Sequence, residues 1–166
     1  NEKVKGENMG NIIDMLNQST ESPAKQQLDK ILEQSIYLQI AAIYQNKPYL
    51  IAMNYAYHQG KIYLHGANKN SKKAVFLANT PIAFQIIEIP QIITGEYPCQ
   101  ATCNYQSLLG EGILRPLAEA EKISALDLIS RKYSPQSPLQ YKEAALEKTA
   151  VWLIEIQKLT GKINNY

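Results

Sequence analysis

The fold of this chain is decided by residues 47–77, which read KPYLIAMNYAYHQGKIYLHGANKNSKKAVFL. Residues 49–57 and 61–66 are rich in Tyr, Ile and Leu, residue types that favour strands. Between these runs, Gly60 suits the positive backbone angles of a tight turn. The stretch therefore predicts a β-hairpin.

A polar segment follows the hairpin and leads into a helical pattern. Apolar residues return at helical spacing, so we predict a helix over residues 71–79 with Ser71 as its N-cap. Lys72 and Lys73 would then stand in the first turn, where free N–H groups and the macrodipole disfavour positive charge. A bound anion would relieve that conflict, so the triplet predicts a phosphate site. A solvated pair of surface lysines is the alternative.

Further strands and helices are expected on both sides of the hairpin. Within residues 105–117, Gly110 and Gly112 would permit a bulge or a close backbone approach. Residues 89–104 contain two prolines, a glycine and both cysteines, and predict a long loop or an irregular edge. Strands are predicted over residues 36–45, 82–88, 105–117 and 150–159, and helices over residues 23–34, 119–132 and 139–148.

These elements predict a mainly β fold with peripheral helices, an α+β protein built on a β-barrel of about six strands. A chain of 166 residues with 45% hydrophobic content can bury one substantial core, so we expect a single domain. Residues 1–22 are polar and predict a partly ordered N-terminal extension.

Composition excludes several classes of function. A net charge of +2 and a pI near 8.4 are too mild for a nucleic-acid binder. The apolar runs are too short to span a bilayer, and a cytoplasmic protein is expected. Cys99 and Cys103 are four residues apart without a second pair of ligands, so they predict free thiols and no metal site.

Three segments in the same order carry a resemblance to a known family. Residues 48–77, the run YQSLLGEG at 105–112 and the run LTGK at 159–162 resemble the FMN-binding split-barrel proteins related to pyridoxamine 5′-phosphate oxidase. Within that family the chain looks most like the nitroimidazole-resistance branch. The resemblance implies a six-stranded antiparallel split β-barrel over residues 23–162, followed by a short tail at 163–166.

The resemblance also implies a cofactor and its site. FMN would lie along the backbone of the hairpin strands, with its phosphate at the basic pair. His65 is the residue implied for proton donation or substrate contact, although a structural strand histidine is the alternative. The cofactor-binding residues implied are Ala52, Met53, Asn54, Tyr55, Leu64, His65, Asn68, Ser71, Lys72, Lys73, Ser107 and Trp152, the last of which equally suits core packing.

The function implied by the resemblance is an oxidoreductase. Electrons would pass from NADH or NADPH through FMN to a small acceptor such as a nitroaromatic or a quinone. A homodimer with flavin sites at its interface is also implied. Two other classes are open at this point: a non-catalytic module that binds flavin or another planar anion, and an interaction protein on the same scaffold that has lost its cofactor.

Overall fold

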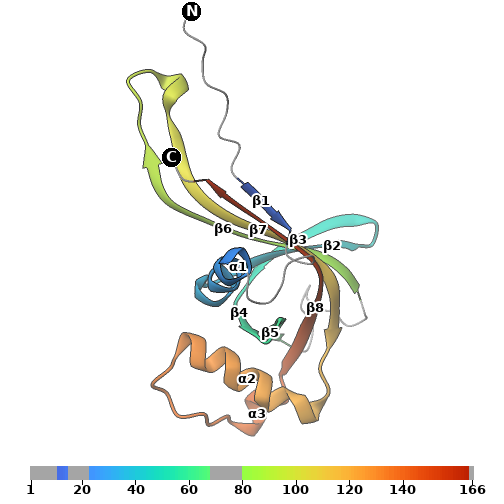
Figure 1. Cartoon of the computed structure of the whole chain (residues 1–166). Helices are drawn as coiled ribbons and strands as arrows, with labels where there is room; N and C mark the ends of the chain where they lie inside the picture. The colour runs from blue at the N-terminus through green and yellow to red at the C-terminus, as the bar shows by residue number, and fades with distance from the viewer. Residues whose placement is uncertain (1–10, 15–22, 68–79, 165–166) are drawn as a thin grey trace, which may run out of the picture.

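The computed structural model describes residues 11–14, 23–67 and 80–164, which form one antiparallel sheet flanked by helices (Figure 1). Over these residues the sheet has eight strands in the order β3-β2-β6-β7-β8-β5-β4, and β1 pairs with β8. The strands are β1 (Asn11–Asp14), β2 (Leu38–Tyr44), β3 (Lys47–Met53), β4 (Tyr55–His58), β5 (Lys61–Ala67), β6 (Thr80–Ile93), β7 (Thr102–Pro116) and β8 (Thr149–Asn164).

The helices cover different parts of this sheet. α1 (Pro23–Gln34) places Leu28 and Leu32 in the main core, and Tyr57 Oη donates a 2.7 Å hydrogen bond to Asp29 of this helix. α2 (Glu119–Tyr133) packs beside β4, β5 and β8 with the short α3 (Glu143–Leu146), as Figure 1 shows. A single 3₁₀ turn, η2 (Pro98–Gln100), lies between β6 and β7.

The predicted mainly β fold is confirmed, but the count of six strands is wrong. One predicted strand, residues 49–57, is two strands separated by Asn54, and β1 adds another. Met53 pairs with Leu38 of β2, whereas Tyr55 pairs with Leu64 of β5. The chain therefore changes its partner strand at Asn54, and no local pattern of residues announces such a change.

The segment 89–104 is mostly paired rather than a loop. β6 continues to Ile93 and β7 begins at Thr102, so the two strands form a hairpin that extends from the body of the molecule (Figure 1). The expected irregularity appears as a register shift between Glu88 and Gln91. Proline is tolerated at such a point because no ladder hydrogen bond is lost there.

The tight turn predicted at Gly60 is confirmed, and a second tight turn joins β2 to β3. Gln45 and Asn46 have φ of 49° and 59°, and Gln59 and Gly60 have φ of 49° and 77°, as tight hairpin turns require. The C-terminal elements differ in length from the prediction. The helix expected over 139–148 is reduced to α3, and the strand expected to end at 159 continues to Asn164.

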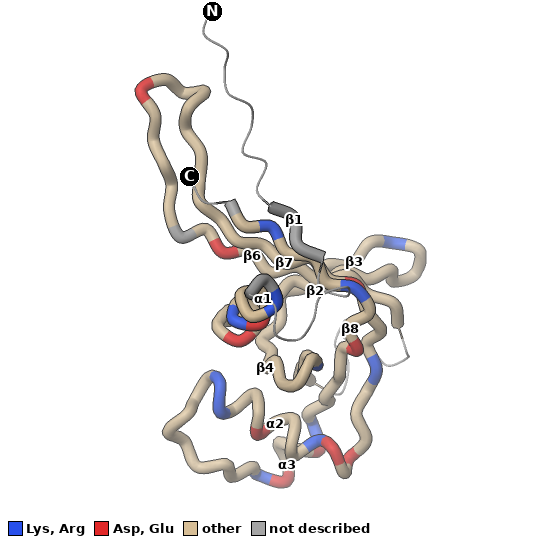
Figure 2. Tube along the Cα trace, in the orientation of Figure 1, with Lys and Arg blue, Asp and Glu red and all other residues tan. Residues whose placement is uncertain are grey.

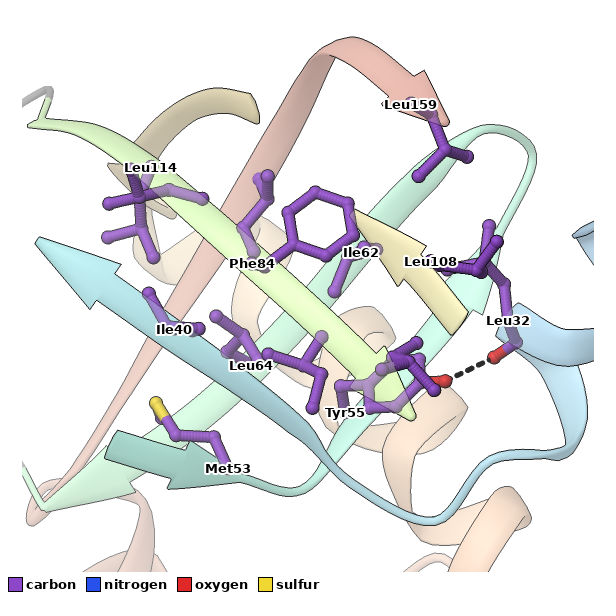
Figure 3. Packing of buried hydrophobic residues seen from close by; sticks show 14 of the residues in the cluster. Leu32, Ile40, Met53, Tyr55, Ile62, Leu64, Phe84, Leu108, Leu114 and Leu159 are labelled. Carbon is purple, nitrogen blue, oxygen red and sulfur yellow. Dashed lines mark hydrogen bonds between the residues drawn. The ribbon is translucent and has the colours of Figure 1, made fainter. Parts of the chain in front are cut away.

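One core lies inside the curved sheet and under α1 (Figure 3). Tyr55 is fully buried there and donates a 2.6 Å hydrogen bond to the carbonyl of Leu32. The prediction for the glycines of β7 is confirmed at Gly112, where the β7–β8 register shifts and a Cβ would lie 2.4 Å from the carbonyl oxygen of Glu155. At Gly110 the close neighbour is a side chain, because a Cβ there would lie 2.1 Å from the Phe84 ring. The largest buried side chains are Trp152, Tyr55, Phe84, Leu28, Leu32, Leu38, Ile40, Ile62, Leu64, Leu108 and Leu114.

Candidate functional site

The sheet is open at one corner, where residues 52–55 and 64–65 of the predicted cofactor site come together. β3 and β4 are the two end strands of the sheet order, yet Asn54 alone separates them in the chain. The two edges must therefore meet at Asn54 and diverge from it. We call residues 52–54 and 65–67 the split corner.

β5 supplies the second side of the split corner. Tyr55 is the first residue of β4 and pairs with Leu64, so residues 65–67 extend beyond the end of β4. In the described part of the chain these three residues pair with β8 on one side, opposite Val151, Ala150 and Thr149. β3 is likewise an end strand of the sheet order over the described residues.

Four predicted cofactor residues have their side chains in the core. Met53, Tyr55, Leu64 and Trp152 are at most 4% exposed, and Leu64 pairs directly with Trp152. These four side chains therefore pack in the core of the described chain rather than at its surface. The core alternative for Trp152 agrees with this placement.

The other described residues fall on different surfaces. Ala52 and Asn54 are exposed at the split corner. His65 is half-buried and projects from the opposite face of β5 to Leu64, the face on which Tyr63 packs with Ala125 and Val151.

Ser107 is half-buried on β7, and β2 and β6 lie between β3 and β7. The structure therefore brings residues 52–55 and 64–65 together but leaves Ser107 apart from them. Asn68, Ser71, Lys72 and Lys73 lie outside the described residues, and so does the helix predicted over 71–79.

Tyr133 is a residue at this corner that the sequence did not indicate. The backbone N–H of Tyr55 donates to Tyr133 Oη at 3.0 Å, and the same hydroxyl bonds the carbonyl of Ile36 and lies 3.2 Å from the carbonyl of Tyr55. One side-chain hydroxyl thus takes the place of a neighbouring strand at the start of β4. Its position in the last turn of a helix gave no sign of this contact.

Lys132 adds a buried charge next to the same tyrosine. Its Nζ is buried without a hydrogen-bond partner in the described structure and lies 3.6 Å from the centre of the Tyr55 ring. Burial lowers the pKa of Lys132 to about 8, against the opposing attraction of Glu33 and Glu88. Burial also raises the pKa of Tyr55, so the phenol stays protonated at neutral pH. The ring face then holds the ammonium group by a cation–π contact.

The outer face of β2, β3, β6 and β7 carries several exposed apolar side chains that the described chain does not cover. A shallow hollow of about 400 Å³ opens on it, lined mainly by small and aliphatic side chains such as Ala41, Ile43, Pro48 and Ala83. Leu50 of β3 is 65% exposed beside it. An exposed apolar surface of this kind is typical of an interaction site.

Two other kinds of site find no support within the described residues. They contain no group of three His, Cys, Asp or Glu side chains that could hold a metal ion. Cys99 and Cys103 are free thiols, as predicted. No described helix combines the length and the apolar character needed to cross a membrane.

Comparison with known proteins identifies the family. The sequence profile described as pyridoxamine 5′-phosphate oxidase matches residues 24–163, a range that contains every predicted site residue. No curated protein sequence matches the chain.

Solved structures share the fold at low sequence identity. The FAD and heme binding protein of Mycobacterium smegmatis superimposes with a TM-score of 0.80 at 14% identity, over 87% of this chain and 73% of that one. A protein described as a putative 5-nitroimidazole antibiotic resistance protein of Bacteroides thetaiotaomicron superimposes with a TM-score of 0.73 at 22% identity, over 92% of this chain and 87% of that one. A flavocytochrome of Azotobacter vinelandii also superimposes with a TM-score of 0.73, at 15% identity, over 86% of this chain and 68% of that one.

Proposed function

This chain belongs to the pyridoxamine 5′-phosphate oxidase family, and on that premise we propose that it is a cytoplasmic, homodimeric flavoprotein that binds FMN. Its activity would be that of an oxidoreductase, with NADH or NADPH as the electron donor and a small nitroaromatic or quinone-like acceptor. The observation that carries the proposal is the family match across residues 24–163. Solved proteins of the same fold include an FAD and heme binding protein and a flavocytochrome, which supports a flavin as the ligand.

The split corner fits a flavin ring. Two strand edges meet there, and backbone N–H and C=O groups along strands are the kind of donors and acceptors that one side of an isoalloxazine needs. Ala52, Gly66 and Ala67 have small side chains and allow a planar ring to approach the backbone. A bound flavin supplies the redox chemistry itself.

The remaining parts of the proposed site come from the sequence. Ser71, Lys72 and Lys73 follow the end of β5 within six residues and would hold the phosphate. His65 would hold the proton that a substrate gains or loses. Its Nδ1 is buried, so the exchange would take place at Nε2.

The test is the cofactor of the purified protein. We expect a yellow protein that releases FMN on denaturation, identified and separated from FAD by chromatography. Anaerobic addition of NADH or NADPH should bleach the flavin, and a nitroaromatic or quinone should restore its colour. A colourless protein that takes up neither flavin would refute the proposal. Bound flavin without reduction would support the non-catalytic alternative.

A further inference from the structure

Lys132 is a buried amine for which the proposed flavin chemistry has no use. It stands beside Arg131 in the basic last turn of α2 (Figure 2). Its Nζ is buried and has no hydrogen-bond partner among the described residues. Lys25, Lys122 and Lys158, by contrast, each pair with a carboxylate. Within the described chain Lys132 therefore lacks the ion pair that holds these other lysines.

Two tyrosine rings lie next to the amine instead. Nζ is 3.6 Å from the centre of the Tyr55 ring and 5.9 Å from that of the Tyr133 ring. Tyr55 is fully buried, whereas Tyr133 is 37% exposed, so one ring beside the amine belongs to the core and the other reaches the surface. Lys132 itself is half-buried, and its side chain can rotate outward without breaking a hydrogen bond.

The acidic neighbours of Lys132 attract the amine without binding it. Glu33 of α1 and Glu88 of β6 favour the charged form, but the carboxylate of Glu88 accepts a hydrogen bond from Ser35. Burial raises the pKa of both neighbouring phenols, which stay neutral at pH 7. Desolvation outweighs the two carboxylates and lowers the pKa of Lys132 to about 8. About a tenth of the amine is then uncharged at pH 7, against roughly one part in 3000 for an ordinary lysine.

This arrangement is the one that makes a lysine nucleophilic. Burial removes water from the ammonium group, and no ion pair in the described chain replaces that water, so the charge costs stability. The uncharged amine has the lone pair that attacks a carbonyl carbon, and desolvation beside apolar groups is a common way to increase its share. A group that weakens the fold and supplies reactivity is typical of a functional site.

We propose that Lys132 forms a reversible imine with small, uncharged aromatic aldehydes. The Nζ lone pair attacks the carbonyl carbon, a C=N bond replaces the C=O bond, and the oxygen leaves as water with the two hydrogens of the amine. The exposed ring of Tyr133 favours an aromatic partner, whereas Glu33 and Glu88 repel an anionic one. No oxidant or reductant takes part, so this activity goes beyond the proposed function and does not depend on a bound flavin.

The first test is reductive trapping in the full chain. Benzaldehyde with sodium cyanoborohydride converts an imine into a stable benzyl amine, which peptide mass spectrometry assigns to its residue. At pH 7 we expect Lys132 to be labelled about ten-fold faster or more than exposed Lys61 and Lys148, because far more of it is uncharged. Its rate should be half-maximal near pH 8, whereas the other two rates should still rise at pH 9.5. Labelling of Lys132 no faster than that of these lysines overturns the proposal.

Two comparisons distinguish a reactive amine from a structural one. 4-Carboxybenzaldehyde is anionic and should label Lys132 about five-fold more slowly than benzaldehyde does, with Lys148 as the internal reference. Glu33→Gln removes one attracting carboxylate and should move the midpoint of the pH profile downward. Glu143→Gln on α3 is the matched control, since Glu143 is exposed and should leave the midpoint unchanged. Equal labelling by both aldehydes, or an unmoved midpoint in Glu33→Gln, overturns the proposal.

Discussion

Lys132 shows how one side chain can make stability depend on pH. Its ordinary pKa of 10.5 applies to the unfolded chain, and burial lowers the folded value to about 8. Between pH 8 and 10.5 the unfolded state therefore binds more protons than the folded state, and this residue makes the free energy of unfolding rise with pH. The Tyr55 ring beneath Nζ supports the charged form and offsets part of the effect.

Lys132→Met should stabilise the protein at pH 7 by about 1–2 kcal/mol, because a partly desolvated charge is removed. The gain should shrink between pH 8 and 10, where the wild-type lysine loses its proton on folding. Urea unfolding at pH 7 and 9.5 measures both values. Exposed Lys148, changed to Met, is the control. Equal effects of the two substitutions would mean that burial of Lys132 costs nothing.

These unfolding measurements should stay below pH 10, because above it the buried tyrosines make the free energy of unfolding fall with pH, whereas Lys132 makes it rise. Burial raises the pKa of Tyr55 and Tyr133 above the ordinary 10.0. The stability that each contributes is complete below pH 10 and is lost as the pH rises further, since the unfolded phenols ionise first.

Tyr133→Phe should weaken the start of β4. The change leaves the N–H of Tyr55 and the carbonyl of Ile36 without their common partner, which we expect to cost about 1–2 kcal/mol. Tyr37→Phe is the control, since Tyr37 is 48% exposed. Chemical denaturation of both variants measures the difference, and similar losses would show that the Tyr133 hydroxyl holds nothing together.

At the scale of elements, the paired long strands β6 and β7 have room for an aromatic ring between them because one of them carries a glycine. Phe84 of β6 pairs with Gly110 of β7, and its ring occupies the space that any β-carbon there would need. The sheet can thus bury a full aromatic ring against the backbone of β7.

Gly110→Ala should therefore destabilise the protein by about 1–3 kcal/mol through overpacking. Combining it with Phe84→Leu should recover part of the loss, because the smaller side chain frees the space. A double-mutant cycle by denaturant unfolding gives the coupling energy. Additive losses would indicate that the glycine is needed for its backbone conformation rather than for contact with Phe84.

At the scale of the whole molecule, the proposed cofactor depends on charge that the sheet does not provide. Lys72→Ala with Lys73→Ala should weaken FMN binding about 100-fold, because charge-assisted contacts to the phosphate are lost. Titration of the flavin-free protein, followed by flavin fluorescence, measures the change. Lys47→Ala with Lys61→Ala removes the same charge from two exposed positions and should have little effect. Equal losses in both double variants would refute a specific phosphate site.

The predicted site was only partly recoverable from sequence, for a reason visible at Asn54. Residue types within 49–57 favour strand throughout, and the pattern contains no sign that the chain leaves β2 for β5 at that point. Leu64 and His65 are neighbours in sequence, but strand alternation sends their side chains to opposite faces. A motif can therefore place a candidate site along the chain without stating which side chains face it.

The sequence by itself determined the mainly β fold, the positions of the hairpin turns, the glycines of β7 and the family, because each depends on local propensity or on residues in a fixed order. Tertiary structure alone decided where the sheet opens, which predicted residues are buried, and that Tyr133 bonds the edge of β4. It also made residues 89–104 the outer part of the β6–β7 hairpin. These features arise from contacts between segments far apart in the chain, and the free energy of such contacts has no counterpart in any local pattern.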